Sequence, residues 1–216
     1  MSIFSSALIV LWGKAGIFYF LLLVVIALLG AAYSAPPIRF KRFHIWAATA
    51  IALVRGPLVN LGIGWFFIET SDQVLFHSEF YDWLLPLTVF ISLFSVGIAW
   101  FKDLPDTAGD LEHGIQTLAV KKSKSTAFRL GFLLVFGGFL FVLIYMGYIT
   151  KWSGESNNYE KENNSFYFMI SQLLGLISFS LASFQVKIHS NNSLKIFYKI
   201  YWVLFFLMYL SYLFLL

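Results

Sequence analysis

The chain contains no cysteine, which excludes disulfide bonds and thiolate metal sites and leaves its redox compartment open. Charged residues are also scarce, at 12% of 216 residues, about half of what a soluble domain carries. The four histidines are scattered without the spacing of a metal site. In contrast, 59% of the chain is hydrophobic and 20% is aromatic. This composition predicts a protein whose main solvent is lipid.

The apolar residues form blocks of about the length needed to cross ~30 Å of hydrocarbon. Residues 1–12 are apolar but too short to span, and we expect them to be the tail of an earlier helix that Gly13 to Gly16 interrupts. The sequence thus predicts an all-α, polytopic transmembrane bundle, a single membrane domain over residues 1–216 that we expect to be incomplete at its N-terminus. The expected spanning helices cover about 16–33, 45–68, 82–101, 127–149, 165–186 and 197–216.

Lysine and arginine are concentrated in the loops at 34–44, 102–126 and 187–196, whereas the opposite side holds few of them. Because positive loops normally stay in the cytoplasm, we expect these three loops to face that side. The first apolar block precedes its cations, which argues against a cleaved signal peptide. The net charge of +4 is explained by these loops, so we expect no nucleic-acid partner.

The most informative segment is 102–110, which reads KDLPDTAGD. Asp103, Asp106 and Asp110 stand at i, i+3 and i+7, a spacing that predicts carboxylates on one face of a helix. Because clustered carboxylates repel one another, such a group favours a bound cation. Oxygen ligands without histidine or cysteine favour Mg²⁺, which usually bridges carboxylates to phosphate oxygens. A solvated acidic loop is the alternative interpretation.

Two basic features accompany the aspartates. Segment 33–42 reads YSAPPIRFKR, in which prolines stiffen a loop that carries Arg39 and Lys41 among its cations. Such a cluster can hold a diphosphate, although an ordinary membrane anchor is the simpler interpretation. Arg55 and Asn60 lie well inside the second apolar block. A charge at that depth costs ~2.5–3.5 kcal/mol, so a functional site is the default hypothesis and a structural ion pair the alternative.

Segments 33–42 and 102–110 resemble two conserved segments of the UbiA prenyltransferase superfamily. The continuation GIQTL at 114–118 and the pattern VRG…VN within 54–60 look most like its homogentisate phytyl/prenyltransferase branch. The resemblance extends from about residue 16 to the end of the chain. It implies a fold of about nine helices around a central cavity, of which the spanning helices and the N-terminal helix stub seen here are the last two thirds.

The resemblance further implies an integral membrane enzyme that uses Mg²⁺ to move a prenyl group from an allylic prenyl diphosphate to an aromatic, homogentisate-like acceptor. Asp103, Asp106 and Asp110 match the family's second aspartate-rich motif and are the implied catalytic and metal-binding residues. The prenyl tail implies contact with membrane lipid. The implied substrate-binding residues are Tyr33, Arg39, Lys41, Arg55, Asn60 and Lys102.

The family's first motif, Asn-x-x-x-Asp-x-x-x-Asp, has no match in the chain. We therefore expect a fragment, a protein completed by a separate polypeptide, or a non-catalytic subunit or remnant. The chain by itself is expected not to transfer prenyl groups. A small membrane transporter is less consistent with the pattern, because the aspartates lie at the interface instead of the bilayer midplane. The acceptor, the prenyl length and the oligomeric state are left open.

Overall fold

The computed structural model describes residues 3–70, 77–152 and 159–212, and within these ranges the chain forms helices and no strands. The second span is built from three consecutive elements, α2 (His44–Leu53), a π-helical segment (Val54–Leu58) and α3 (Val59–Thr70). Short elements connect the spans: a 3₁₀ turn (Phe40–Arg42), α5 (Thr107–Glu112) and α6 (Leu118–Lys121). The long helices are α1 (Ile3–Ser34), α4 (His77–Asp103), α7 (Lys124–Trp152), α8 (Tyr159–Phe184) and α9 (Asn191–Ser211).

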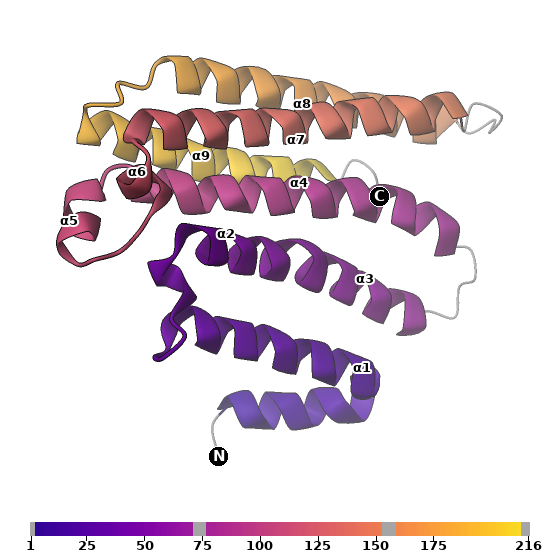
Figure 1. Ribbon diagram of the computed structural model, residues 1–216. Coiled ribbons are helices and arrows are strands. Elements are labelled where there is room, and N and C mark those ends of the chain that lie inside the picture. The colour runs from indigo at the N-terminus through magenta and orange to yellow at the C-terminus, as the bar shows by residue number, and fades with distance from the viewer. Residues whose placement is uncertain (1–2, 71–76, 153–158, 213–216) are drawn as a thin grey trace.

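Six helical segments are long and apolar enough to cross a membrane, which confirms the predicted all-α polytopic bundle. The residues before the first span are helical too, because α1 begins at Ile3, and its ribbon bends back on itself (Figure 1). The predicted tail is therefore part of the same helical element as the first span. The segments are Ile17–Ser34, His44–Gly62, Trp83–Asp103, Lys124–Thr150, Asn163–Phe184 and Asn191–Ser211.

Helix α4 is the central helix of the bundle (Figure 1). It contacts α2, the π-helical segment and α3 on one side, and α7 and α9 on the other. Helix α1 lies at the outer edge, where it contacts α2, the π-helical segment and α3. Helix α4 contains the most buried of the six candidate spans, and it ends at Asp103, where the aspartates begin.

An aromatic core fixes α4 to α9. Phe94 stacks on Tyr201 with the ring centroids 4.2 Å apart, and the Tyr201 hydroxyl donates a hydrogen bond of 2.7 Å to the Phe94 carbonyl. Gly97 leaves room for this hydroxyl, because a Cβ atom at that position would collide with it. Phe139 of α7 meets Phe90 of α4 edge to face, with the centroids 4.9 Å apart. These contacts hold α4 in a fixed position below the aspartate segment.

Candidate active site

The loops singled out from the sequence meet at one end of the bundle, where the connection from α1 to α2 lies beside α5 and α6 (Figure 1). The backbone joins them directly. The Gln116 N–H donates to the Arg42 carbonyl at 3.1 Å, and the Gln116 carbonyl accepts from the His44 N–H at 3.4 Å. Segment 33–42, here called the basic loop, and the segment that follows the aspartates are therefore on the same side of the bundle.

The aspartate segment is not one continuous helix, so the predicted single helical face is wrong. Helix α4 ends at Asp103, residues 104–106 form a turn, and α5 begins at Thr107. Pro105 accounts for the break, because proline lacks an N–H and disfavours a helical conformation in the residue before it. The side chain of that preceding residue, Leu104, is fully buried and anchors the turn to the core.

The turn nevertheless leaves the three carboxylates within electrostatic range of one another. The strongest electrostatic neighbours of Asp103 are Asp110, Lys102 and Asp106. Lys102 and Asp106 are exposed, whereas Asp103 and Asp110 are half-buried. Three acidic groups thus share one site with a single adjacent lysine, which is a repulsive arrangement that a bound cation would stabilise.

Asp110 shows most clearly that the cluster is incomplete by itself. Its Oδ2 atom is buried and has no hydrogen-bond partner among the described residues. Burial raises the pKa of Asp110, and the nearby Asp106 carboxylate raises it further. A hydrogen bond with the Thr117 side chain lowers this pKa, as do the charges of Lys102 and His113. The carboxylate therefore retains an oxygen whose hydrogen-bonding capacity no described residue uses.

Thr117 is a residue that sequence reasoning missed. It caps α6, because its Oγ1 accepts from the Val120 N–H at 3.3 Å. The same buried side chain also hydrogen-bonds to Asp110. A threonine directly before the short run LAVK is a typical N-cap signal, and this signal could have indicated the start of a helix at Leu118. Thr117 connects the orientation of Asp110 to the start of α6.

Within the described part of the chain, no three or more His, Asp or Glu side chains are arranged around one point as a metal cage. The donors that are present still fit Mg²⁺. They are hard carboxylate oxygens, and Asp110 offers one that is free of protein partners. Mg²⁺ commonly takes one or two carboxylates and completes its shell with water and substrate phosphate oxygens. Asp103, Asp106 and Asp110 would supply the protein's share.

The basic loop has an unusual backbone at Arg39, whose φ of 42° and ψ of 61° lie in the left-handed region. For a residue with a side chain this conformation costs roughly 1–2 kcal/mol. It is held by the Arg39 N–H, which donates to the Ala35 carbonyl at 3.0 Å, and by the Arg42 N–H, which donates to the Arg39 carbonyl. Arg39 and Lys41 are both exposed, so their charges are available at this end of the bundle.

Arg55 lies in the π-helical segment inside the second span, next to Pro57. Pro57 interrupts the regular helix, because it lacks the N–H that would bond the Leu53 carbonyl. The Val59 N–H bonds to the Gly56 and Val54 carbonyls, and the Arg55 carbonyl accepts a hydrogen bond of 3.0 Å from the Asn60 side-chain amide. The Asn60 oxygen in turn accepts from the Tyr209 hydroxyl of α9 at 2.7 Å. The Arg55 guanidinium lies over the Trp202 ring, 5.2 Å from its centroid. Two contacts to α9 thus set the position of Arg55.

Tyr33, near the end of α1, connects the two polar regions. Its electrostatic neighbours are Asp103 on α4 and Arg55 in the π-helical segment. Three helices far apart in the sequence therefore bring a carboxylate, a phenol and a guanidinium together. The structure places Tyr33, Arg55 and Asp103 in one continuous region, with Asn60 behind Arg55.

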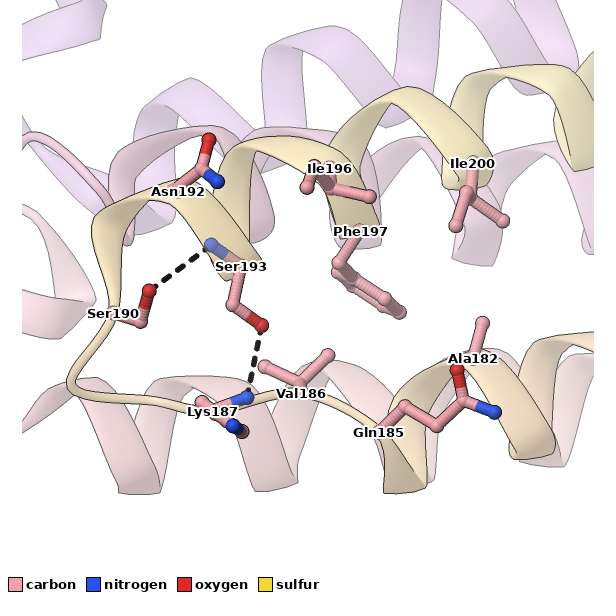
Figure 2. Close-up of a pocket in the computed structure, with 10 residues that line it drawn as sticks. All are labelled: Ala182, Gln185, Val186, Lys187, Ser190, Asn192, Ser193, Ile196, Phe197 and Ile200. Atoms are coloured by element: carbon pink, nitrogen blue, oxygen red, sulfur yellow. Dashed lines mark hydrogen bonds between the residues drawn. The ribbon is translucent and has the colours of Figure 1, made fainter.

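A separate pocket of about 290 Å³ lies between the end of α8 and the start of α9 (Figure 2). The Ser193 hydroxyl accepts from the Lys187 N–H at 3.0 Å, and the Ser193 N–H donates to the Ser190 hydroxyl. The lining contains one lysine and no carboxylate. Its chemistry therefore differs from that of the aspartate site.

Comparison with known proteins decides the family. The model of the UbiA prenyltransferase family matches residues 1–154, which include both the basic loop and the aspartate segment. The chain belongs to the UbiA prenyltransferase family. Family membership and the six apolar helices together make it an integral, multi-pass membrane protein.

The curated relatives of this UbiA-family chain include three prenyltransferases named for homogentisate. The phytyltransferase of Synechocystis sp. is 34% identical over 207 residues, which cover 96% of this chain and 63% of the relative. The geranylgeranyltransferase of Triticum aestivum is 41% identical over 111 residues, 50% of this chain and 26% of the relative. The solanesyltransferase of Arabidopsis thaliana is 35% identical over 161 residues, 63% and 40% of the two chains.

The chain spans less than two thirds of the length of these relatives. No solved structure is significantly similar to it.

Proposed function

We propose that this chain carries the diphosphate-binding end of a membrane prenyltransferase that moves a prenyl group from an allylic prenyl diphosphate to a homogentisate-like aromatic acceptor. The observation that carries the proposal is the backbone pairing of Arg42, in the basic loop, with Gln116, in the segment that directly follows the aspartates. Opposite charges from distant parts of the chain are thereby collected at one end of an apolar bundle. The printed names of the relatives support the same reaction.

In this proposal Asp103, Asp106 and Asp110 hold Mg²⁺ against the diphosphate. The ion, when bound, neutralises part of the leaving group's negative charge. The turn at Leu104 and Pro105 fixes the carboxylates before substrate arrives, because Leu104 is buried in the core. Preorganised charges of this kind act without reorganisation at the moment of reaction.

Arg39, Lys41 and Lys102 take up the remaining negative charge as the allylic C–O bond breaks. The diphosphate leaves with the bonding electrons, the aromatic ring forms the new C–C bond, and the ring then loses a proton. All three cations are exposed at the end of the bundle where the carboxylates lie. Exposed cations can close on a diphosphate from the water side, while the aspartates hold it from the bundle side.

Tyr33 contacts the substrate between the diphosphate and the deeper part of the site, because its neighbours are Asp103 and Arg55. Asn60 has a different role in this proposal. Its amide is bonded to Arg55 and Tyr209, so it positions the segment that carries Arg55. The apolar side chains on the outer faces of the helices face lipid, which also accommodates the prenyl tail. In this proposal the site faces the cytoplasm, which the excess of basic residues in its loops supports.

The test is a transfer assay in membranes with Mg²⁺, geranylgeranyl diphosphate and homogentisate. The chain is expressed alone and together with the part of the Synechocystis relative that the alignment leaves uncovered. We expect a prenylated product in the second setting, and its loss on Asp103→Ala. The relative expressed as the same two pieces is the positive control. If the split relative is active and this chain forms no product in either setting, the proposed reaction is wrong.

A further inference from the structure

We propose that Arg55 binds the carboxylate of the aromatic acceptor, so that the site selects aromatic acids over neutral phenols. This inference rests on the proposed prenyl transfer and names the chemical class of its second substrate. It follows from the environment of the guanidinium, from the way its backbone is held and from its depth relative to the aspartates.

The guanidinium of Arg55 has a charge that no described carboxylate neutralises through an ion pair. Its Nη1 atom is buried and has no hydrogen-bond partner among the described residues. Its Cζ atom lies over the Trp202 ring, 5.2 Å from the centroid. A cation–π contact uses no N–H group as a hydrogen-bond donor, so the buried Nη1 is available to an acceptor. The planar guanidinium fits a carboxylate, which can accept two parallel hydrogen bonds from it.

The backbone beneath Arg55 is held from several sides. Asn60 binds its carbonyl oxygen, and Tyr209 binds Asn60 across to α9. On the other side, Gly56 lies so close to α4 that a Cβ atom there would collide with the Ser92 side chain. This close approach and the hydrogen bonds fix the base of the arginine side chain. A fixed base limits the conformational freedom that ligand binding would remove.

The depth of Arg55 points to the acceptor and not to the diphosphate. Arg55 lies eleven residues beyond His44, where α2 begins, which corresponds to roughly 16 Å along the helix axis. Its side chain leans back toward the start of α2 and reaches the vicinity of Tyr33. The strongest neighbours of Asp103 are Lys102 and the other two aspartates. Arg55 is not among these neighbours, whereas Tyr33 interacts with both Asp103 and Arg55.

This spacing suits a ring between two anchors. The carbon that the acceptor attacks is bonded directly to the diphosphate, which the aspartates hold. The acceptor ring must therefore lie just below the diphosphate, at the level of Tyr33. A carboxylate on a short substituent of that ring then points deeper, toward the donor edge of Arg55.

The experiment measures acceptor binding by calorimetry, with the full chain in lipid nanodiscs. The ligands are homogentisate and its methyl ester, which keeps the ring and both hydroxyls but has no charge. We expect the unmodified chain to bind the acid about 10–100-fold more tightly than the ester, the range of a charge-assisted hydrogen-bonded pair. Arg55→Gln should abolish this preference, and Arg55→Lys should keep part of it, because lysine retains the charge without the fork.

Arg129→Gln is the matched control, because Arg129 is an exposed arginine of α7 outside the site, and it should bind both ligands as the unmodified chain does. The inference is overturned if the unmodified chain binds acid and ester equally, or if Arg55→Gln weakens both to the same extent. It is also overturned if Arg55→Gln weakens binding of geranylgeranyl diphosphate about as much as that of the acid. If Arg55→Gln does not fold, the acid preference of the unmodified chain and its reduction in Arg55→Lys decide the question.

The calorimetric titration measures acceptor binding and does not measure prenyl transfer. An acid preference in a protein that transfers no prenyl group would overturn only the proposed reaction. Transfer without any acid preference would overturn only the role of Arg55.

Discussion

Replacing Asn60 by leucine should destabilise the bundle, because this buried amide joins the π-helical segment to α9. The substitution removes the bond to the Arg55 carbonyl and the bond from Tyr209, of 3.0 and 2.7 Å. Hydrogen bonds between membrane helices contribute about 0.6 kcal/mol on average and at most about 1.7 kcal/mol each. The free energy of unfolding should therefore fall by about 1–3 kcal/mol. Tyr209→Phe removes one of the two bonds and should cost about half as much.

The assay is reversible unfolding in mixed micelles, followed by circular dichroism for each single variant and the double variant. Because both substitutions break the bond between Asn60 and Tyr209, the double variant should lose less than the sum of the single losses. Tyr198→Phe is the control, since its hydroxyl has no hydrogen-bond partner among the described residues. If Asn60→Leu leaves the stability unchanged and raises only the KM for a substrate, Asn60 contacts substrate and does not position Arg55.

Three further predictions follow from the site and the packing. In the chain complemented with the uncovered part of the Synechocystis relative, Asp103→Ala should lower prenyl transfer at least ~10²-fold without changing helicity. Chelation followed by Mg²⁺ addition should abolish and restore transfer by the same complemented chain without the substitution; near-normal transfer by the variant would remove the aspartate from the chemistry. Gly56→Ala should cost about 1–3 kcal/mol of unfolding free energy, because its Cβ atom would collide with α4, whereas Gly147→Ala, with open space around its Cβ atom, should cost nothing; equal losses in the two variants would contradict the close packing. Single cysteines at Ser34 and Ala108, in a chain without other cysteines, should react with an impermeant reagent from the same side of the membrane, and labelling from opposite sides would separate the two loops.

Several features of the fold could be predicted from the sequence because they depend on short windows of the chain. The number of spans and their approximate bounds follow from the lengths of the apolar blocks, since an unpaired backbone is excluded from hydrocarbon. The positions of the cations and carboxylates at the ends of these blocks could also be read from the sequence, because charged residues interrupt the apolar runs. The resemblance of segments 33–42 and 102–110 to UbiA sequences agrees with the family match.

Local patterns were less informative about the aspartates. Their spacing predicted one helical face, whereas α4 ends at Asp103, just before Pro105, and a turn keeps the carboxylates within electrostatic range of one another. The helical period describes only an unbroken helix, so a proline within the motif makes it unreliable. The contribution of Thr117 to the site was missed because its hydrogen bond to Asp110 depends on how α6 folds back.

The sequence by itself determined that this protein is a bundle of apolar helices with acidic and basic residues at their ends. Only the tertiary structure decided which of these residues meet. The bond between Tyr209 and Asn60 joins residues 149 positions apart, and the backbone pairing of Arg42 with Gln116 joins two loops that the second and third spans separate. No periodicity along the chain encodes such pairs, because they arise from side-chain packing between helices such as Phe94 against Tyr201, and that packing sets which helix ends and which buried polar groups come together.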